Sequence, residues 1–168
     1  MIDKIVVCIS VIVILFTAAI GQAESTISYR EYVNPRYSYK VLYADGLLMP
    51  QGEAANGDGQ KFRSSDADVE MAVWGSHNVF DETLKSKFLD ASAGKRKAVD
   101  RTVTYSRCAD KWFVVSGVEG DRVFYEKTYL INDVFLTYFM TYPFSKKKVW
   151  DKINATISKS FVSTDAEP

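Results

Sequence analysis

The sequence predicts an α+β domain in which an antiparallel β-sheet is flanked by helices on both faces. Between residues 29 and 142 the chain consists mainly of β-branched and aromatic runs with period-two alternation. Only two segments, one inside this range and one after it, show helical spacing. The run Val134–Tyr142 is apolar on both alternating faces, so we expect layers above and below it. Strands interrupted by few helices are typical of an antiparallel sheet rather than a doubly wound parallel one.

The first 23 residues have the three-part pattern of a secretory signal peptide. Met1–Lys4 precedes the uncharged apolar run Ile5–Ile20, and small residues then lead to a predicted cleavage between Ala23 and Glu24. An uncleaved membrane anchor is the competing interpretation, but this run of 16 residues is shorter than the roughly 18–20 that span a bilayer. We therefore expect a periplasmic or secreted protein with no stable membrane anchor after cleavage.

Residues 24–168 are predicted to form a single α+β domain with a core from about Thr26 to Val162. Hydrophobic residues make up 47% of the chain and charged residues 25%, a composition typical of globular proteins. Cleavage would leave Cys108 as the single cysteine, so no internal disulfide is expected. For Cys108 we favour a small buried hydrophobe beside a hairpin turn over a reactive thiol.

The first half of the domain is predicted to hold short strands. They are, in chain order, Tyr29–Val33, Tyr37–Tyr43, Lys61–Ser64 and Val69–Gly75. The intervening segment 44–59 has turn signals, including Pro50, and is expected to be a loop. Five of the ten tyrosines lie between Tyr29 and Tyr43. We favour packing within strands for them over a binding surface.

The second half is predicted to contain a helix, a β-meander and a final helix. Helical spacing relates Phe80, Leu84, Phe88 and Ala91, with Gly94 as a stop. The predicted meander strands are Val103–Cys108, Trp112–Ser116, Val123–Leu130 and Val134–Tyr142, with the turn pair Asn132-Asp133 before the last. The final helix, Lys146–Phe161, is expected to begin at a Ser145 cap and to bury Val149, Ile153, Ile157 and Phe161.

No catalytic or metal-binding pattern is apparent, and we expect no cofactor. His77 is the only histidine, and we favour an exposed loop residue over a catalytic one. The loop 56–59, Asn-Gly-Asp-Gly, offers oxygen ligands, but Ala67 stands where a calcium loop of the EF-hand type needs glutamate. Positive φ in a tight turn is the simpler explanation of its glycines.

Charge and motifs also argue against nucleic acid and nucleotide partners. The formal net charge is zero and the pI is about 6.6, whereas phosphate binding requires a basic surplus. Neither a G-x-G-x-x-G pattern nor a G-x-x-x-x-G-K pattern occurs.

Several segments resemble a group of small secreted bacterial proteins of unknown function. The segments are Tyr32–Tyr39, the loop 51–59 with Phe62, residues 67–75, the strand Trp112–Gly117 and the helix ending Ser160-Phe161. Ser38 departs from the glycine expected in that group. The order of elements also resembles the PsbP-like α/β/α sandwich shared by periplasmic DcrB-like proteins. These resemblances imply a fold and a secreted location but transfer no catalytic residues.

Three functional hypotheses follow. The leading one is an exported, non-catalytic binding or assembly module of the periplasm or envelope whose partner is another envelope or secreted protein. Its expected contact surface is the loop 56–59 with the segment 74–77, and the candidate binding residues are Asn56, Asp58, Trp74 and His77. The second is a hydrolase that uses His77 with carboxylates, which predicts a pocket around that residue. The third is an inhibitor of a secreted toxin or hydrolase.

Overall fold

The computed structural model describes residues 26–93 and 100–165. The predicted signal peptide and its cleavage site at Ala23 and Glu24 lie outside these residues, as does the predicted helix stop at Gly94. In the two described ranges, no helix has both the length and the apolar character needed to cross a membrane.

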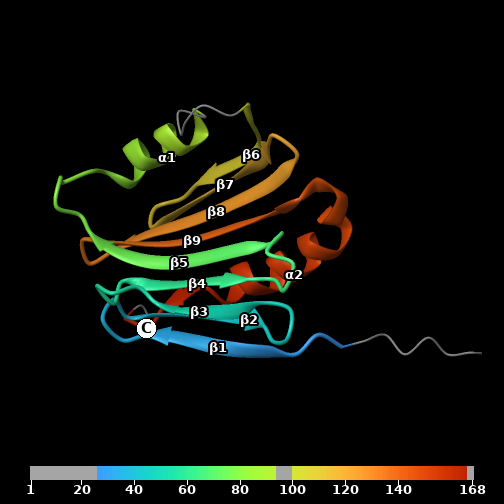
Figure 1. The fold of residues 1–168 in the computed structure, drawn as a ribbon. Helices are drawn as coiled ribbons and strands as arrows, with labels where there is room; N and C mark the ends of the chain where they lie inside the picture. The colour runs from blue at the N-terminus through green and yellow to red at the C-terminus, as the bar shows by residue number, and fades with distance from the viewer. Residues whose placement is uncertain (1–25, 94–99, 166–168) are drawn as a thin grey trace, which may run out of the picture.

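Two antiparallel sheets form the frame of the molecule (Figure 1). The large sheet has seven strands in the order β3 (Met49–Glu53), β4 (Gly59–Arg63), β5 (Glu70–His77), β9 (Val134–Pro143), β8 (Arg122–Ile131), β7 (Trp112–Glu119) and β6 (Arg101–Cys108). The small sheet has three strands in the order β1 (Tyr29–Asn34), β2 (Tyr39–Ala44) and β10 (Val162–Ser163). The predicted antiparallel α+β class is therefore confirmed, with a second sheet that the sequence did not reveal.

The two helices pack on opposite faces of the large sheet. Helix α1 (Leu84–Ser92) buries Leu84 and Ala91 in a cluster with Phe113, Phe124 and Phe135. Helix α2 (Lys147–Ser160) buries Trp150, Ile153 and Ile157 in a cluster with Tyr138, Met140 and Tyr142. Because side chains alternate along a strand, Phe135 and Tyr138 of β9 point to opposite faces, as the period-two pattern predicted.

The small sheet covers the same face as α2. Tyr39 and Val41 of β2 are fully buried in the α2 cluster, together with Phe62 of β4 and Met71 of β5. The remaining tyrosines of the N-terminal segment, Tyr29, Tyr32, Tyr37 and Tyr43, pack against this core. Strand packing therefore explains the clustered tyrosines, as the sequence predicted.

Several predicted boundaries are wrong for identifiable reasons. β3 lies inside the predicted loop. All its residues are exposed, so its sequence has no alternation of apolar and polar residues that would predict a strand. It also contains Pro50, and proline occurs only in strands at the edge of a sheet. The 3₁₀ turn η1 (Phe144–Lys146) precedes α2, and no side chain caps that helix, so the Ser145 cap is not formed. α2 buries Trp150 in place of the predicted Val149, which is exposed, whereas the predicted Ile153, Ile157 and Phe161 are all buried.

The turn predictions are partly confirmed. Asn132 and Asp133 both have positive φ, as a two-residue hairpin turn with primed geometry requires. Gly57 also has a positive φ of 64°. Ser38 has a φ of 51°, in the left-handed region that favours glycine, the residue expected there from the resemblance.

Gly59 is required for another reason than the one predicted. Its φ is not in the left-handed region, but a Cβ there would lie 1.9 Å from the backbone oxygen of Val73 and 2.8 Å from both the Trp74 Cα and the Tyr39 hydroxyl. The glycine therefore allows β4 to approach β5 while the Tyr39 ring packs over the pair.

We predict that Gly59→Ala lowers the free energy of unfolding by more than about 3 kcal/mol, because the contact with Val73 involves backbone that cannot move aside. Gly52→Ala is the matched control: its φ is 91° but nothing lies within 4 Å of the added Cβ. It should cost only the backbone strain, about 1–2 kcal/mol. Urea unfolding measures both, and equal losses would contradict the close-approach explanation.

Candidate functional site

The loop that contains Asn56 and Asp58 is a tightly bonded turn between β3 and β4. Asn56 Nδ2 donates to Asp58 Oδ2 at 2.7 Å, and the Arg36 guanidinium donates to the Asn56 carbonyl. The Asp58 carbonyl accepts from the Tyr39 hydroxyl at 3.1 Å and from the Gly75 amide at 2.9 Å. These bonds fix the turn against β2 and β5, so its side chains are presented from a rigid support.

Asp58 and Trp74 meet at a shallow hollow of about 440 Å³, which we call the Trp74 hollow. It is lined by residues 51, 52, 54, 58–61 and 72–74 of β3, β4, β5 and the turn. Trp74 pairs with Gly59 across the strands and is half-buried. Asn56 and His77 do not line the hollow. The structure thus brings together only two of the four predicted binding residues.

His77 occupies the exposed end of β5 rather than the predicted turn between strand and helix. Its imidazole lies 5.3 Å from the Tyr37 ring, centroid to centroid. His77 does not line the Trp74 hollow, whereas the hydrolase hypothesis predicts a pocket around this residue. Among residues 26–93 and 100–165, no group of three or more His, Cys, Asp or Glu side chains is placed to hold a metal ion.

A short apolar projection follows His77, and the sequence analysis assigned it wrongly. Phe80 was predicted to begin the helix stripe, but α1 begins at Leu84, capped by the Thr83 hydroxyl. Val79 is 74% exposed and Phe80 is 81% exposed. We call residues 78–82, which present these two side chains, the Asn78 tip.

Buried Asn78 holds this tip in place. Its Nδ2 donates to the Glu82 carbonyl and to Asp133 Oδ1, both at 3.0 Å, and its Oδ1 accepts from the Glu82 amide at 2.9 Å. Its backbone amide donates to the Asp133 carbonyl at 3.0 Å. The side chain therefore bridges the tip and the β8–β9 turn, so that the exposed apolar residues sit on a fixed loop.

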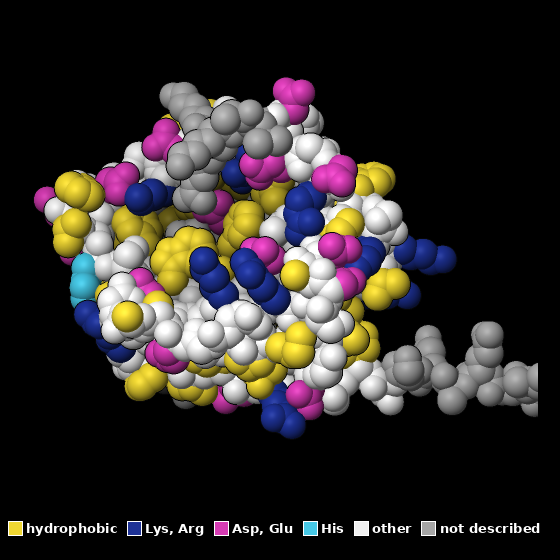
Figure 2. Space-filling model, in the orientation of Figure 1, with side chains coloured by type: hydrophobic (Ala, Val, Ile, Leu, Met, Phe, Trp, Pro, Cys, Tyr) yellow, Lys and Arg dark blue, Asp and Glu magenta, His cyan; other side chains and the backbone are white. Residues whose placement is uncertain are grey.

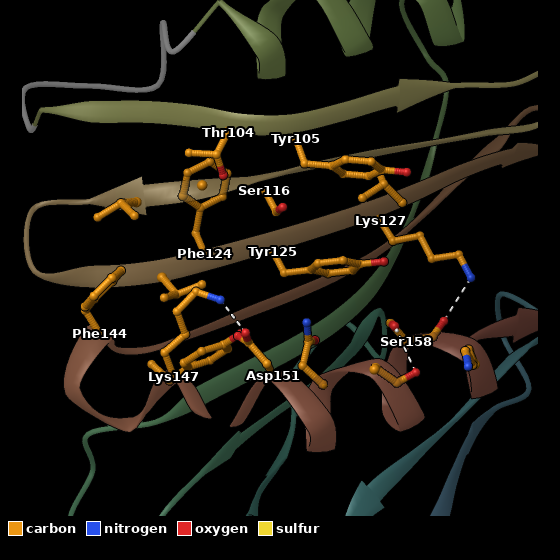
Figure 3. A pocket seen from close by; sticks show the side chains of 18 of the residues that line it. Thr104, Tyr105, Ser116, Phe124, Tyr125, Lys127, Phe144, Lys147, Asp151 and Ser158 are labelled. Atoms are coloured by element: carbon orange, nitrogen blue, oxygen red, sulfur yellow. Dashed lines mark hydrogen bonds and ion pairs between the residues drawn. The ribbon is translucent and has the colours of Figure 1, made fainter. Parts of the chain in front are cut away.

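A larger groove lies on the opposite face of the large sheet, between α2 and strands β6–β8 (Figure 3). This α2 groove has a volume of about 730 Å³. Its floor includes four aromatic side chains: Tyr105, Trp112, Tyr125 and Tyr129. Its α2 wall includes Lys147, Asp151, Asn154, Ser158 and Lys159. In Figure 3, Tyr105 and Tyr125 lie on the strand side of the groove, and Asp151 and Ser158 lie on the helix side.

Lys127 crosses the groove and ties its floor to the end of α2. Its Nζ donates to the Ser158 carbonyl at 2.9 Å and to the Phe161 carbonyl at 3.4 Å. A cation at a helix C-terminus is favoured by the helix dipole. Burial nevertheless lowers the pKa of Lys127 from 10.5 to about 8. Burial also raises the pKa of Tyr125 and of Tyr129.

The sequence analysis did not predict the α2 groove, although the sequence contains part of the pattern that forms its floor. Every second residue of β8 from 125 to 129 lines the groove, namely Tyr125, Lys127 and Tyr129. Their partners on the neighbouring strand β7 are Ser116, Val114 and Trp112, in that order. Alternation places both sets on one face of the sheet. The sequence pattern could not predict that α2 packs over β9 and leaves this face of β6–β8 open.

The comparisons with known proteins show the fold. No family model matches the chain, and no curated protein matches it. The solution structure of cyanobacterial PsbP (CyanoP) from Synechocystis sp. PCC 6803 is similar: it shares 13% identity, covers 84% of this chain and 95% of its own, and has a TM-score of 0.61. The predicted PsbP-like fold is therefore confirmed.

We predict that Lys127 makes the free energy of unfolding rise with pH from about 8 toward 10.5. In this interval the unfolded chain holds a proton on Lys127 that the folded chain has released, because burial lowers the folded pKa. Unfolding by urea at pH 7.5 and 9.5 should show a larger gain for the wild type than for Lys127→Met. Equal gains for the two proteins would show that Lys127 keeps its proton in the fold.

Proposed function

We propose that this protein is an exported, non-catalytic binding module of the bacterial periplasm or envelope, and that its partner is another protein of that compartment. The predicted signal peptide supports export. The PsbP-like fold is compatible with such a role but does not specify it. The observation on which the proposal depends is the exposure of Val79 and Phe80 on the Asn78 tip.

Adjacent exposed apolar side chains are typical of a contact surface when the loop beneath them is rigid. Removing a phenylalanine side chain from water is favourable by about 1.5–3 kcal/mol, and aromatic side chains often provide the central contacts of protein interfaces. The hydrogen bonds of Asn78 fix the loop before any partner arrives. Less conformational entropy is therefore lost on association.

The Trp74 hollow extends this surface along β5. Trp74 and the tip are joined by residues 75–77, and the hollow opens on the face of the sheet on which α1 packs. Figure 2 views this face, where hydrophobic side chains lie in a recess between charged side chains. An apolar centre with a polar rim is the usual anatomy of a protein interface. The proposed contact surface thus keeps Asp58, Trp74 and His77 and adds Val79 and Phe80.

We predict that replacing Val79 and Phe80 together by serine reduces capture of the partner from envelope extracts of the native host by at least about tenfold, because the exposed apolar anchors are removed. Immobilised wild-type and variant proteins are compared by quantitative mass spectrometry. The matched control is Val33→Ser, which replaces a valine that is 47% exposed on β1 of the small sheet.

A partner retained by Val33→Ser and lost from the double variant supports the tip as the contact. Identical protein sets on all three samples would overturn it. Asp58→Ala and Trp74→Ala then test whether the Trp74 hollow belongs to the same surface. The identity of the captured protein separates an assembly role from the inhibitor hypothesis, since the latter requires a toxin or hydrolase.

A further inference from the structure

We propose that the α2 groove is a separate binding site for a carboxylated saccharide of the uronate type. The groove is on the face of the large sheet opposite the Trp74 hollow, so this site is independent of the proposed protein partner. Its volume of about 730 Å³ falls within the range of about 300–1,000 Å³ found for small-molecule sites.

The floor of the groove suits a sugar ring. Tyr105, Trp112, Tyr125 and Tyr129 line the groove from three neighbouring strands, and Tyr105 is 51% exposed. Arg107 lies over the Trp112 ring and Lys127 over the Tyr129 ring, so Tyr105 offers the most accessible ring. A pyranose ring has an apolar C–H face that packs on such rings and an edge of hydroxyls that needs hydrogen bonds. Tyrosine and tryptophan provide both an apolar body and a polar group.

Asn154 supplies a buried polar group directed to the groove. It is only 6% exposed and lines the groove from α2. Its Oδ1 accepts from the buried Tyr138 hydroxyl at 2.6 Å, which fixes the orientation of the amide. Within the described residues its Nδ2 has no hydrogen-bond partner, so two donors are available to a ligand oxygen.

The charge of the groove favours an acidic sugar over a neutral one. Lys127, Lys147 and Lys159 line it, and Asp151 is the one acidic residue among its lining residues. That carboxylate accepts from the Tyr142 hydroxyl at 2.7 Å and pairs with Lys147. Lys127 already donates to two carbonyls. The positive charge of Lys159 on the exposed rim therefore faces no carboxylate of the groove and can attract one from a ligand.

The same features argue against an acyl chain. A fatty-acid site requires an enclosed apolar channel, because each buried methylene contributes only when water is excluded. This groove is open and has polar groups along its floor and wall, including Ser116, Asn154 and Ser158. A ligand rich in hydroxyl groups loses less binding free energy than an acyl chain does when such polar groups remain partly hydrated.

The test is titration of the purified protein with trigalacturonate, followed by calorimetry and by NMR chemical shifts. Galactotriose is the neutral control, and palmitate tests the acyl alternative. We expect saturable binding of trigalacturonate at least tenfold tighter than that of galactotriose, with no displacement by palmitate. Equal affinity for both sugars, palmitate displacement, or no binding by the folded protein would each overturn the proposal.

Variants locate the site. Tyr105→Ser removes an exposed ring, and Asn154→Asp keeps the oxygen that accepts from Tyr138 while replacing the amide donors by a carboxylate. Each should weaken trigalacturonate binding at least tenfold, whereas Lys159→Gln should weaken it several-fold and reduce its salt dependence. Lys61→Gln, on the opposite face at the Trp74 hollow, is the control and should leave the affinity unchanged.

Unchanged affinity in all three groove variants, with native thermal unfolding, would also overturn the assignment. The double serine variant of the Asn78 tip separates the two proposals. It should lose partner capture and keep sugar binding.

Discussion

The structure depends on burial of β9 from both sides. Leu136, Tyr138, Met140 and Tyr142 of this strand point to the core beneath α2, and Phe135 and Phe139 point to the cluster beneath α1. Each layer can bury its apolar residues only against this strand and its neighbours. The Tyr138–Asn154 hydrogen bond inside that core also fixes the rotation of α2 about its axis. The Trp74 hollow and the α2 groove both lie where the layers that cover the large sheet end.

Helix size explains why each face of the sheet has an open region. Strands about 4.8 Å apart make a seven-stranded sheet about 29 Å wide, whereas a helix with its side chains is about 10–12 Å across. One helix therefore covers only about two strands. α1 packs on β6 and β7 and leaves the Trp74 hollow open; the small sheet and α2 share the other face and leave the α2 groove beside β6–β8.

Local regularity determined which parts of the fold the sequence predicted. Val134–Tyr142 alternates over a long run and was placed within one residue of its observed end. β3 has no buried residue, and β10 has two residues, so neither has a detectable period. Phe80 matched helical spacing by position alone, but the hydrogen bonds of Asn78 with Glu82 and Asp133 end β5 in a fixed loop instead. Asp133 is 55 positions away.

By itself, the sequence determined the antiparallel α+β class, most strands, the last helix and the resemblance to a PsbP-like fold, because alternation and helical spacing are local properties. It also placed Trp74 and Asp58 in one candidate surface. Only the tertiary structure decided that His77 lies outside the Trp74 hollow, that Val79 and Phe80 are exposed on the Asn78 tip, and that Asn154 lines one groove with four aromatic residues. Those relations join residues far apart in the chain, and packing alone brings them together.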